Sequence, residues 1–304
     1  MTKLVAIDAG HGMRTEGKRT PKLKKDLIVN GKIVKRKGEI IHEHEWNRAV
    51  AKYIAAGLAR NGIDYMYTAD MVGNKDIALS TRARKANSKK ADILVSCHYN
   101  AVGSCASFQN RIKGLLVLRT KNCSQKSIKL GSLIHKHLRA DCNYEYSYGL
   151  MRDVDMSGFT LAILRQTNMP SVLVEYGFMD YEKEAVKMLN PVWQKQCAEA
   201  TVKGICEYFG MKYKKDTAKK DEHKKDNVEQ DTSFKPYTVK IEEDILNVRK
   251  GPGTEYDKVT TVKKGDAYTV IDEARSEDGG TWGLLKAFKK ERDGWINLKY
   301  TKKK

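Results

Sequence analysis

The 304-residue sequence contains no run of 18 or more apolar residues, so it predicts no membrane-spanning helix. Its N-terminus, Met1 to Leu4, leads directly into a strand-like run and has neither the apolar core nor the cleavage site of a signal peptide. The six cysteines form no C-x-x-C pair and none follows Cys206, which argues against a zinc ribbon or a redox motif. We therefore expect synthesis in a reducing cytoplasm without a signal peptide.

Two common functional motifs are also missing, one catalytic and one for cofactor binding. The sequence has no H-E-x-x-H motif, which excludes the commonest helix of zinc proteases. Gly10-His11-Gly12 lacks the third glycine of a dinucleotide-binding loop, so this match is weak.

Positive charge is in excess, and it is unevenly distributed. The net charge is +19, of which residues 1–213 carry +15 and residues 234–304 carry +4, whereas residues 214–233 balance six lysines with six acids. A basic surface indicates a polyanionic partner, which charge alone leaves open among nucleic acid, an anionic membrane and an anionic cell wall.

The length favours about two domains. Over residues 1–213, short apolar runs alternate with amphipathic stretches, which predicts an α/β fold: a mostly parallel central sheet with helices on both faces. The expected helices cover residues 44–60, a segment capped by Ser80 and ending at Asn87, a segment from Ser124 to Ala140, and Pro191–Phe209; the expected strands include Leu4–Ala9, "DYMYTAD", "DILVSCH", "GLLVLR", "SVLVEYGF" and a hairpin around Asn30-Gly31.

Residues 214–233 are polar and nearly free of large apolar side chains, so we expect a flexible linker there. Residues 234–304 contain short strand-like runs separated by glycine and aspartate turns: "YTVKI", "KVTTV", "AYTVIDEA", "WGLLKA" and "GWINLKY". This pattern predicts a small all-β barrel.

Three polar residues lie at or just beyond the ends of predicted strands: His11, His98 and Glu175. In an open α/β sheet, sites form outside the carboxyl ends of the strands, so these residues could meet as a His₂Glu zinc site. Each also has a structural interpretation. The histidines could be capping or surface residues, and Glu175 could be a buried carboxylate paired with a base such as Arg165.

Five blocks carry a family resemblance: "AIDAGHG", "EHEWNRAVAKYIAAGLARNG", "LSTRARKAN", "ADILVSCHYNA" and "MPSVLVEYGFMD". In this order and spacing they resemble the zinc-dependent N-acetylmuramoyl-L-alanine amidases of the type-3 family, over about residues 1–209. The resemblance implies that His11, Glu43 and His98 bind Zn²⁺ and that Glu175 is the catalytic acid/base. It thus moves Glu175 from the metal to proton transfer, and leaves Glu45 as a rival ligand that we expect to point elsewhere. Glu39, His42 and His44 are weaker rivals, interpreted as a solvated turn.

The sequence departs from the commonest pattern of that family in the basic insertion, residues 14–38. It is interpreted either as a solvated surface hairpin or as an extra rim of the substrate groove that contacts an anionic wall.

The C-terminal segments "ILNVRKGPGTEYDKVTTVKKGDAYTVI" and "DGWINLKY" resemble bacterial SH3-type modules, which are taken to bind peptidoglycan. Under this resemblance Tyr256, Trp282 and Trp295 are expected to line a peptide groove, although each is equally suited to the barrel core.

The resemblances together imply a peptidoglycan hydrolase that cleaves the amide between N-acetylmuramic acid and the L-alanine of the stem peptide. The expected partners are peptidoglycan and anionic wall polymers, not nucleic acid. The missing signal peptide favours a phage endolysin that reaches the wall after release, with a bacterial autolysin as the alternative. Two further functions remain open at this point: a zinc peptidase acting on wall peptides, and a non-catalytic protein that binds the wall or another polyanion.

Overall fold

The computed structural model describes residues 2–216, 236–249, 251–276, 279–285 and 294–303. The chain forms two compact units, Met1–His223 and Lys224–Lys304, which are treated separately below. Most of the predicted linker, residues 214–233, lies outside the described residues. Within the described residues, no helix is both long enough and apolar enough to cross a bilayer.

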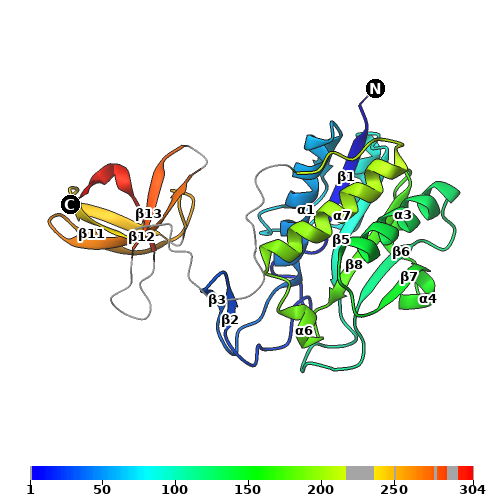
Figure 1. Ribbon diagram of the computed structural model, residues 1–304, viewed down its shortest axis with the longest axis horizontal. Coiled ribbons are helices and arrows are strands. Elements are labelled where there is room, and N and C mark those ends of the chain that lie inside the picture. The colour runs from blue at the N-terminus through cyan, green and yellow to red at the C-terminus, as the bar shows by residue number, and fades with distance from the viewer. Residues whose placement is uncertain (1, 217–235, 250, 277–278, 286–293, 304) are drawn as a thin grey trace. The chain divides into compact units, whose positions relative to one another are not determined.

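The first unit is built on a six-stranded sheet with the order β4-β1-β5-β8-β6-β7 (Figure 1). Neighbouring strands from β4 to β8 run parallel, β6 is antiparallel to β8, and β7 is parallel to β6. The predicted mostly parallel sheet is therefore confirmed. The strands are β1 (Leu4–Ala9), β4 (Asp64–Tyr67), β5 (Ile93–Asn100), β6 (Leu115–Arg119), β7 (Ser147–Arg152) and β8 (Ser171–Phe178).

Helices cover both faces of this sheet. Successive strand residues point to opposite faces, and on each face they are buried in a separate apolar cluster. Val5 and Ile7 belong to the larger cluster, whereas Ala6 between them belongs to the smaller one. The larger cluster packs under α1 (Glu43–Arg60), α3 (Gln125–Asp141) and α7 (Pro191–Tyr208), and the smaller under α2 (Leu79–Ser88) and α5 (Ala162–Arg165). A sheet buried on both faces has near-continuous apolar strands, as the sequence shows.

The predicted boundaries need a few corrections. Helix α2 has Ala78, not Ser80, as its N-cap, whereas the predicted cap of α3 is confirmed because the Ser124 side chain accepts a hydrogen bond from the amide of Ser127. Strand β7 and the short helices α4 (Asp153–Ser157), α5 and α6 (Glu182–Ala185) were not predicted. These helices have four or five residues each, too few to display a helical period.

The basic insertion forms the predicted hairpin, with β2 (Leu27–Val29) paired to β3 (Lys32–Lys35). Its turn residues, Asn30 and Gly31, have φ values of 50° and 73°, as a two-residue hairpin turn with left-handed residues requires.

The second unit is all-β. Its seven-stranded sheet has the order β11-β10-β14-β13-β12-β9-β15, and every pairing is antiparallel. One apolar cluster, which includes Val248, Val270 and Ile296, fills its core. Strands β10 and β15 were not predicted. The strands are β9 (Tyr237–Ile241), β10 (Ile245–Arg249), β11 (Lys258–Lys263), β12 (Ala267–Arg275), β13 (Thr281–Leu285), β14 (Gly294–Asn297) and β15 (Thr301–Lys303), with a 3₁₀ turn at Leu298–Tyr300.

Candidate metal centre

His11 lies in the loop just beyond β1. Steric contacts explain why the residues on both sides of it are glycines. A side chain at Gly10 would place its Cβ 2.2 Å from Cε1 of His98, so the imidazole of His98 packs directly on the Gly10 backbone. A Cβ at Gly12 would lie 3.1 Å from the backbone nitrogen of Asp76. His11 itself has a φ of 60°, in the left-handed region. The absence of side chains at Gly10 and Gly12 therefore lets this loop pass close to the ring of His98 and to the backbone of Asp76.

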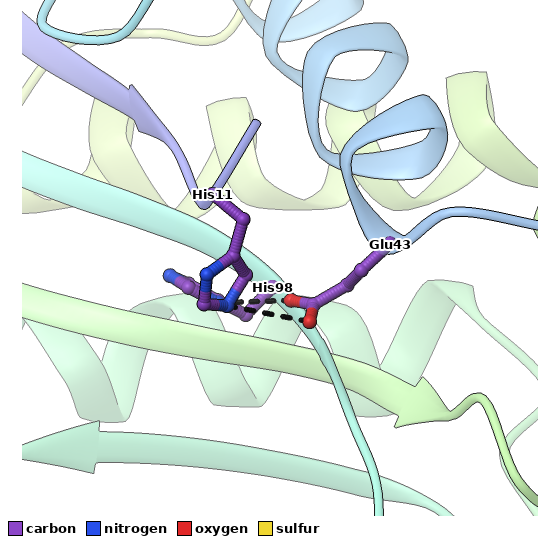
Figure 2. A group of neighbouring side chains, drawn as sticks. All are labelled: His11, Glu43 and His98. Atoms are coloured by element: carbon purple, nitrogen blue, oxygen red, sulfur yellow. Dashed lines mark hydrogen bonds and ion pairs between the residues drawn. The ribbon is translucent and has the colours of Figure 1, made fainter. Parts of the chain in front are cut away.

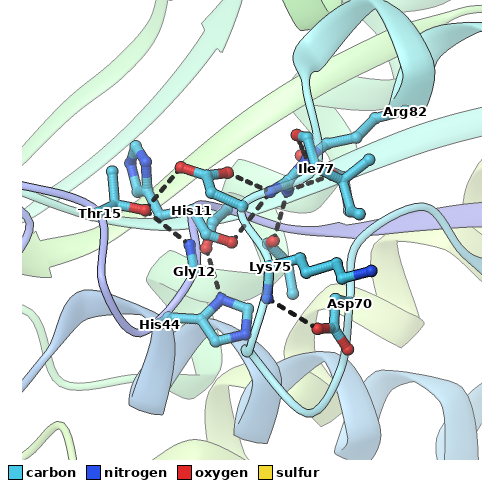
Figure 3. Close-up of polar contacts among 12 residues, drawn as sticks. His11, Gly12, Thr15, His44, Asp70, Lys75, Ile77 and Arg82 are labelled. Carbon is cyan, nitrogen blue, oxygen red and sulfur yellow. Dashed lines mark hydrogen bonds and ion pairs between the residues drawn. The ribbon is translucent and has the colours of Figure 1, made fainter.

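Arg82 of α2 holds this loop in place (Figure 3). Its guanidinium is fully buried and donates to the carbonyl of Ala9 at 2.7 Å and to the carbonyl of His11 at 2.9 Å. It also bonds Oδ1 of Asp8 at 3.0 Å and Oδ1 of Asp76 at 2.9 Å. A buried charge is tolerated only when it is paired and hydrogen-bonded, and Arg82 meets both conditions.

Asp8 completes this buried ion pair from inside β1. Its carboxylate also accepts hydrogen bonds from Thr68 and Ser96, each at 2.6 Å. Burial opposes ionisation of Asp8, but Arg82 and these hydroxyl groups outweigh it and lower the pKa of the carboxyl group. The last residues of β1 are thus fixed from both sides before the chain reaches His11.

Glu43, the first residue of α1, meets both histidines (Figure 2). Its Oε1 lies 2.9 Å from Nδ1 of His98, and its Oε2 lies 3.3 Å from Nε2 of His11. The Oε1 atom also accepts from Nδ2 of Asn47 and from the amide of Tyr99, both at 3.1 Å. One potential ligand atom from each of the three residues lies within 4.8 Å of the other two.

Charge and burial shape the titration of this cluster. Burial alone would raise the pKa of Glu43, but the imidazoles of His11 and His98 outweigh it and lower that pKa. Burial lowers the pKa of His11 to about 4, so its ring is neutral at neutral pH. Burial also acts to lower the pKa of His98, but the neighbouring carboxylates, chiefly Glu43, outweigh it and raise that pKa. Two imidazole nitrogens and an ionised carboxylate that converge from separate segments are a donor set that suits Zn²⁺.

The structure at the start of α1 distinguishes Glu43 from the other candidate ligands nearby. Oε1 of Glu45 accepts a hydrogen bond from the backbone amide of His42 at 2.9 Å and pairs with Lys35 at 3.0 Å, so this carboxylate points away from the cluster. His44 was expected in a solvated turn, which is wrong. It is fully buried, and its Nδ1 lies 2.8 Å from the carbonyl oxygen of Gly10.

Glu175 lies beside the cluster but is not one of the three converging groups. On β8 it is the register partner of His98 on β5. Its Oε2 atom is buried and has no hydrogen-bond partner among the described residues. Burial raises the pKa of Glu175 to about 7, with Glu43 acting in the same direction and His98 against it. Among the described residues, Glu175 forms no ion pair with Arg165.

The sequence analysis did not identify the residues that hold the three candidate ligands in position. Asn47 donates both to Glu43 and to the carbonyl of Gly10, at 3.1 Å in each case, and so links one candidate ligand to the loop that carries another. Asp8 offered a signal, because an acid at the end of a buried apolar strand needs a cationic partner. Nothing in the sequence identified Arg82 as that partner.

The three aromatic residues expected at a groove of the second unit differ in exposure. Trp282 is 3% exposed and donates from Nε1 to Oγ of Ser276 at 3.0 Å, whereas Tyr256 is 42% exposed and Trp295 is partly buried. Trp282 and Tyr300 share the wall of a cavity of about 390 Å³, which Tyr256 and Trp295 do not line. The structure therefore does not gather the three predicted residues into one groove.

Comparison with known proteins extends these observations. Residues 5–207 match the family described as N-acetylmuramoyl-L-alanine amidase, and residues 244–302 match the bacterial SH3 domain. Both predicted resemblances are thereby confirmed. The match also favours an amidase over the peptidase and the non-catalytic binder that the sequence left open.

Individual relatives agree with the family match. The endolysin of Bacillus phage SPP1 is 31% identical over 216 residues, which cover 70% of this chain and 69% of the endolysin. The amidase LytC of Bacillus subtilis is 25% identical over 205 residues, 67% of this chain and 35% of LytC. The crystal structure of an N-acetylmuramoyl-L-alanine amidase from Clostridium difficile 630 aligns with a TM-score of 0.54 at 25% identity, over 69% of this chain and 98% of that one.

Proposed function

Because this chain belongs to the N-acetylmuramoyl-L-alanine amidase family and therefore hydrolyses the amide between N-acetylmuramic acid and L-alanine, we propose that His11, Glu43 and His98 hold a zinc ion for this reaction. The observation that supports the proposal is the convergence of one atom from each residue, although the three come from separate segments: the loop after β1, the first turn of α1, and β5. Zinc held by three protein ligands supplies a water of lowered pKa and polarises a carbonyl group.

Glu175 is proposed to move the proton. A general acid/base works best when its pKa lies near the working pH, and burial brings the pKa of Glu175 to about 7. Its carboxylate would take a proton from the attacking water and deliver it to the amine of the departing L-alanine. The Oε2 atom is suited to this role because no described residue occupies it with a hydrogen bond.

The backbone around the site keeps these groups in position. Arg82 donates to the carbonyls of Ala9 and His11, and Asn47 donates to the carbonyl of Gly10 between them. The backbone that carries His11 is therefore fixed, so its imidazole needs little reorganisation to reach a ligand geometry. Gly10 contributes by having no side chain where His98 lies.

The second unit is proposed to bind the cell wall. Its match to the bacterial SH3 domain supports this role, and the cavity beside Trp282 is the proposed contact surface. The +15 charge of residues 1–213 would add attraction to anionic wall polymers. Since its relatives include a phage endolysin, we propose that the enzyme is made in the cytoplasm and acts on the wall after release.

The decisive experiment is digestion of purified cell walls followed by mass spectrometry of the fragments, with zinc measured in the same preparation. An amidase releases peptides that begin with a free L-alanine amine and leaves the glycan chains intact. Cleavage only between amino acids would instead identify a peptidase. Full activity of a zinc-free preparation in chelator would contradict the metal assignment.

A further inference from the structure

A cavity of about 730 Å³ lies beyond the carboxyl ends of β5 and β8. These are the neighbouring strands that carry His98 and Glu175 as register partners. The cavity wall begins at Val102, shortly after His98, and includes Asp180, shortly after Glu175. The same two strands therefore position both the reacting groups and this cavity.

The wall of the cavity is well ordered by its own hydrogen bonds. Buried Asp180 accepts from the amide of Val102 at 2.8 Å, and its carbonyl accepts from the amide of Gln109 at 2.9 Å. The side chain of Gln109 in turn donates to the carbonyl of Ile112 at 2.6 Å and accepts from the amide of Arg111 at 2.8 Å. The loop that presents Arg111 is thus held in shape before any ligand binds.

The cavity wall contains one charged side chain of each sign, Arg111 and Asp180. Arg111 is exposed and has no ion-pair partner among the described residues. Cys105, also in the wall, is influenced by charges of both signs: burial raises the pKa of this thiol to about 11, Asp180 and Glu43 act in the same direction, and Arg19 and Lys18 act to lower it.

We propose that this cavity binds the stem peptide on the leaving-amine side of the scissile bond, and that Arg111 engages a carboxylate on the second or third residue of that peptide. The inference rests on the proposed function. A strand advances roughly 3.3 Å per residue, so Val102 lies at most about 13 Å along the chain from His98, a distance that three or four residues of extended peptide cover. The carboxylate of Asp180 accepts hydrogen bonds from Val102 and Gln109 of the cavity wall. The guanidinium of Arg111 therefore remains available to bind an anionic group of the ligand.

The test compares three soluble muramoyl tripeptides on the full-length enzyme. The first carries γ-linked D-glutamate and diaminopimelate at positions two and three, the second has the glutamate carboxylate amidated, and the third has lysine in place of diaminopimelate. We expect the wild type to favour the first over at least one of the others by about tenfold in KM, the range of a charge-assisted hydrogen bond. Arg111→Ala should remove that preference with kcat within about twofold, and Arg111→Lys should restore part of it.

Arg84→Ala on α2 is the matched control, because it removes another exposed arginine from the same unit and should leave the preference intact. Equal KM values for all three peptides with the wild type would overturn the inference. An equal increase in KM for all three peptides with Arg111→Ala would also overturn the inference, because Arg111 would then contact a group that the three peptides share. Failure of the wild type to cleave any of them would contradict the proposed function instead.

Discussion

The region at the carboxyl ends of the central strands of the α/β sheet and the core of the second unit differ in the side chains that they bury. Around the candidate metal centre the structure buries several charged or strongly polar side chains: Asp8, Glu43, His44, Asn47 and Arg82. Among the described residues of the second unit, the buried polar side chain is Ser276, which bonds Trp282, and the rest of the core is apolar.

This difference is consistent with the two proposed roles, catalysis in the first unit and wall binding in the second. A catalytic centre needs groups whose charge and pKa are set by burial and by one another, so its polar residues must be desolvated together. A binding module needs only a stable scaffold and a surface, which an apolar core provides. Variants that disturb each kind of core should therefore fail in different ways.

The largest effect is expected from the three proposed metal ligands. Each of His11→Ala, His98→Ala and Glu43→Ala should abolish stoichiometric zinc binding, because a site with three protein ligands loses one of them. Metal analysis of the purified variants checks this, beside loss of wall cleavage. Glu45→Ala is the matched control and should keep zinc, since Glu45 bonds His42 and Lys35. Loss of zinc in Glu45→Ala with retention in Glu43→Ala would reverse the assignment.

Glu175→Gln should slow turnover by about 10²–10⁴-fold, the usual contribution of a general acid/base. Zinc content and KM should stay near the wild type, because glutamine has nearly the same shape. Zinc, melting temperature and amide cleavage are to be measured on one preparation. A metal-free variant would make Glu175 a ligand, and a destabilised but active variant would make it a structural carboxylate.

Arg82→Ala should lower the free energy of unfolding by about 3–5 kcal/mol, because it leaves the buried carboxylate of Asp8 without its partner. Denaturant unfolding of the zinc-free protein isolates this effect from metal binding. Arg84→Ala, which removes an exposed arginine of the same helix, should change stability by less than about 0.5 kcal/mol. Similar values for the two variants would show that Arg82 does not anchor the His11 loop.

Separation of the two units should have the smallest effect on chemistry. Residues 1–213 alone should fold, retain zinc and cleave soluble muramoyl peptides at the rate of the whole chain, because the core of the sheet is self-contained. Residues 234–304 alone should bind purified walls without cutting them. Co-sedimentation with walls tests the second part; a fragment that stays in the supernatant would refute the proposed wall-binding role.

The sequence by itself determined the α/β class, the all-β second unit and most helix positions, because burial on both faces of a sheet and helical periodicity are local patterns. It also contained the blocks that resemble the amidase family, and hence the candidates His11, Glu43, His98 and Glu175. From strand ends alone, however, Glu175 was placed on the metal, since periodicity does not report which carboxylate reaches two histidines.

Only the tertiary structure decided how these segments meet. It brought Glu43 from the first turn of α1 close to His11, which follows β1, and to His98 on β5. It also turned Glu45 away toward Lys35. It paired Asp8 with Arg82 and placed His44 in the interior, although neither contact has a local signature. The physical reason is that ligand geometry and buried ion pairs depend on distances between residues far apart in the chain, which the packing of helices on the sheet sets.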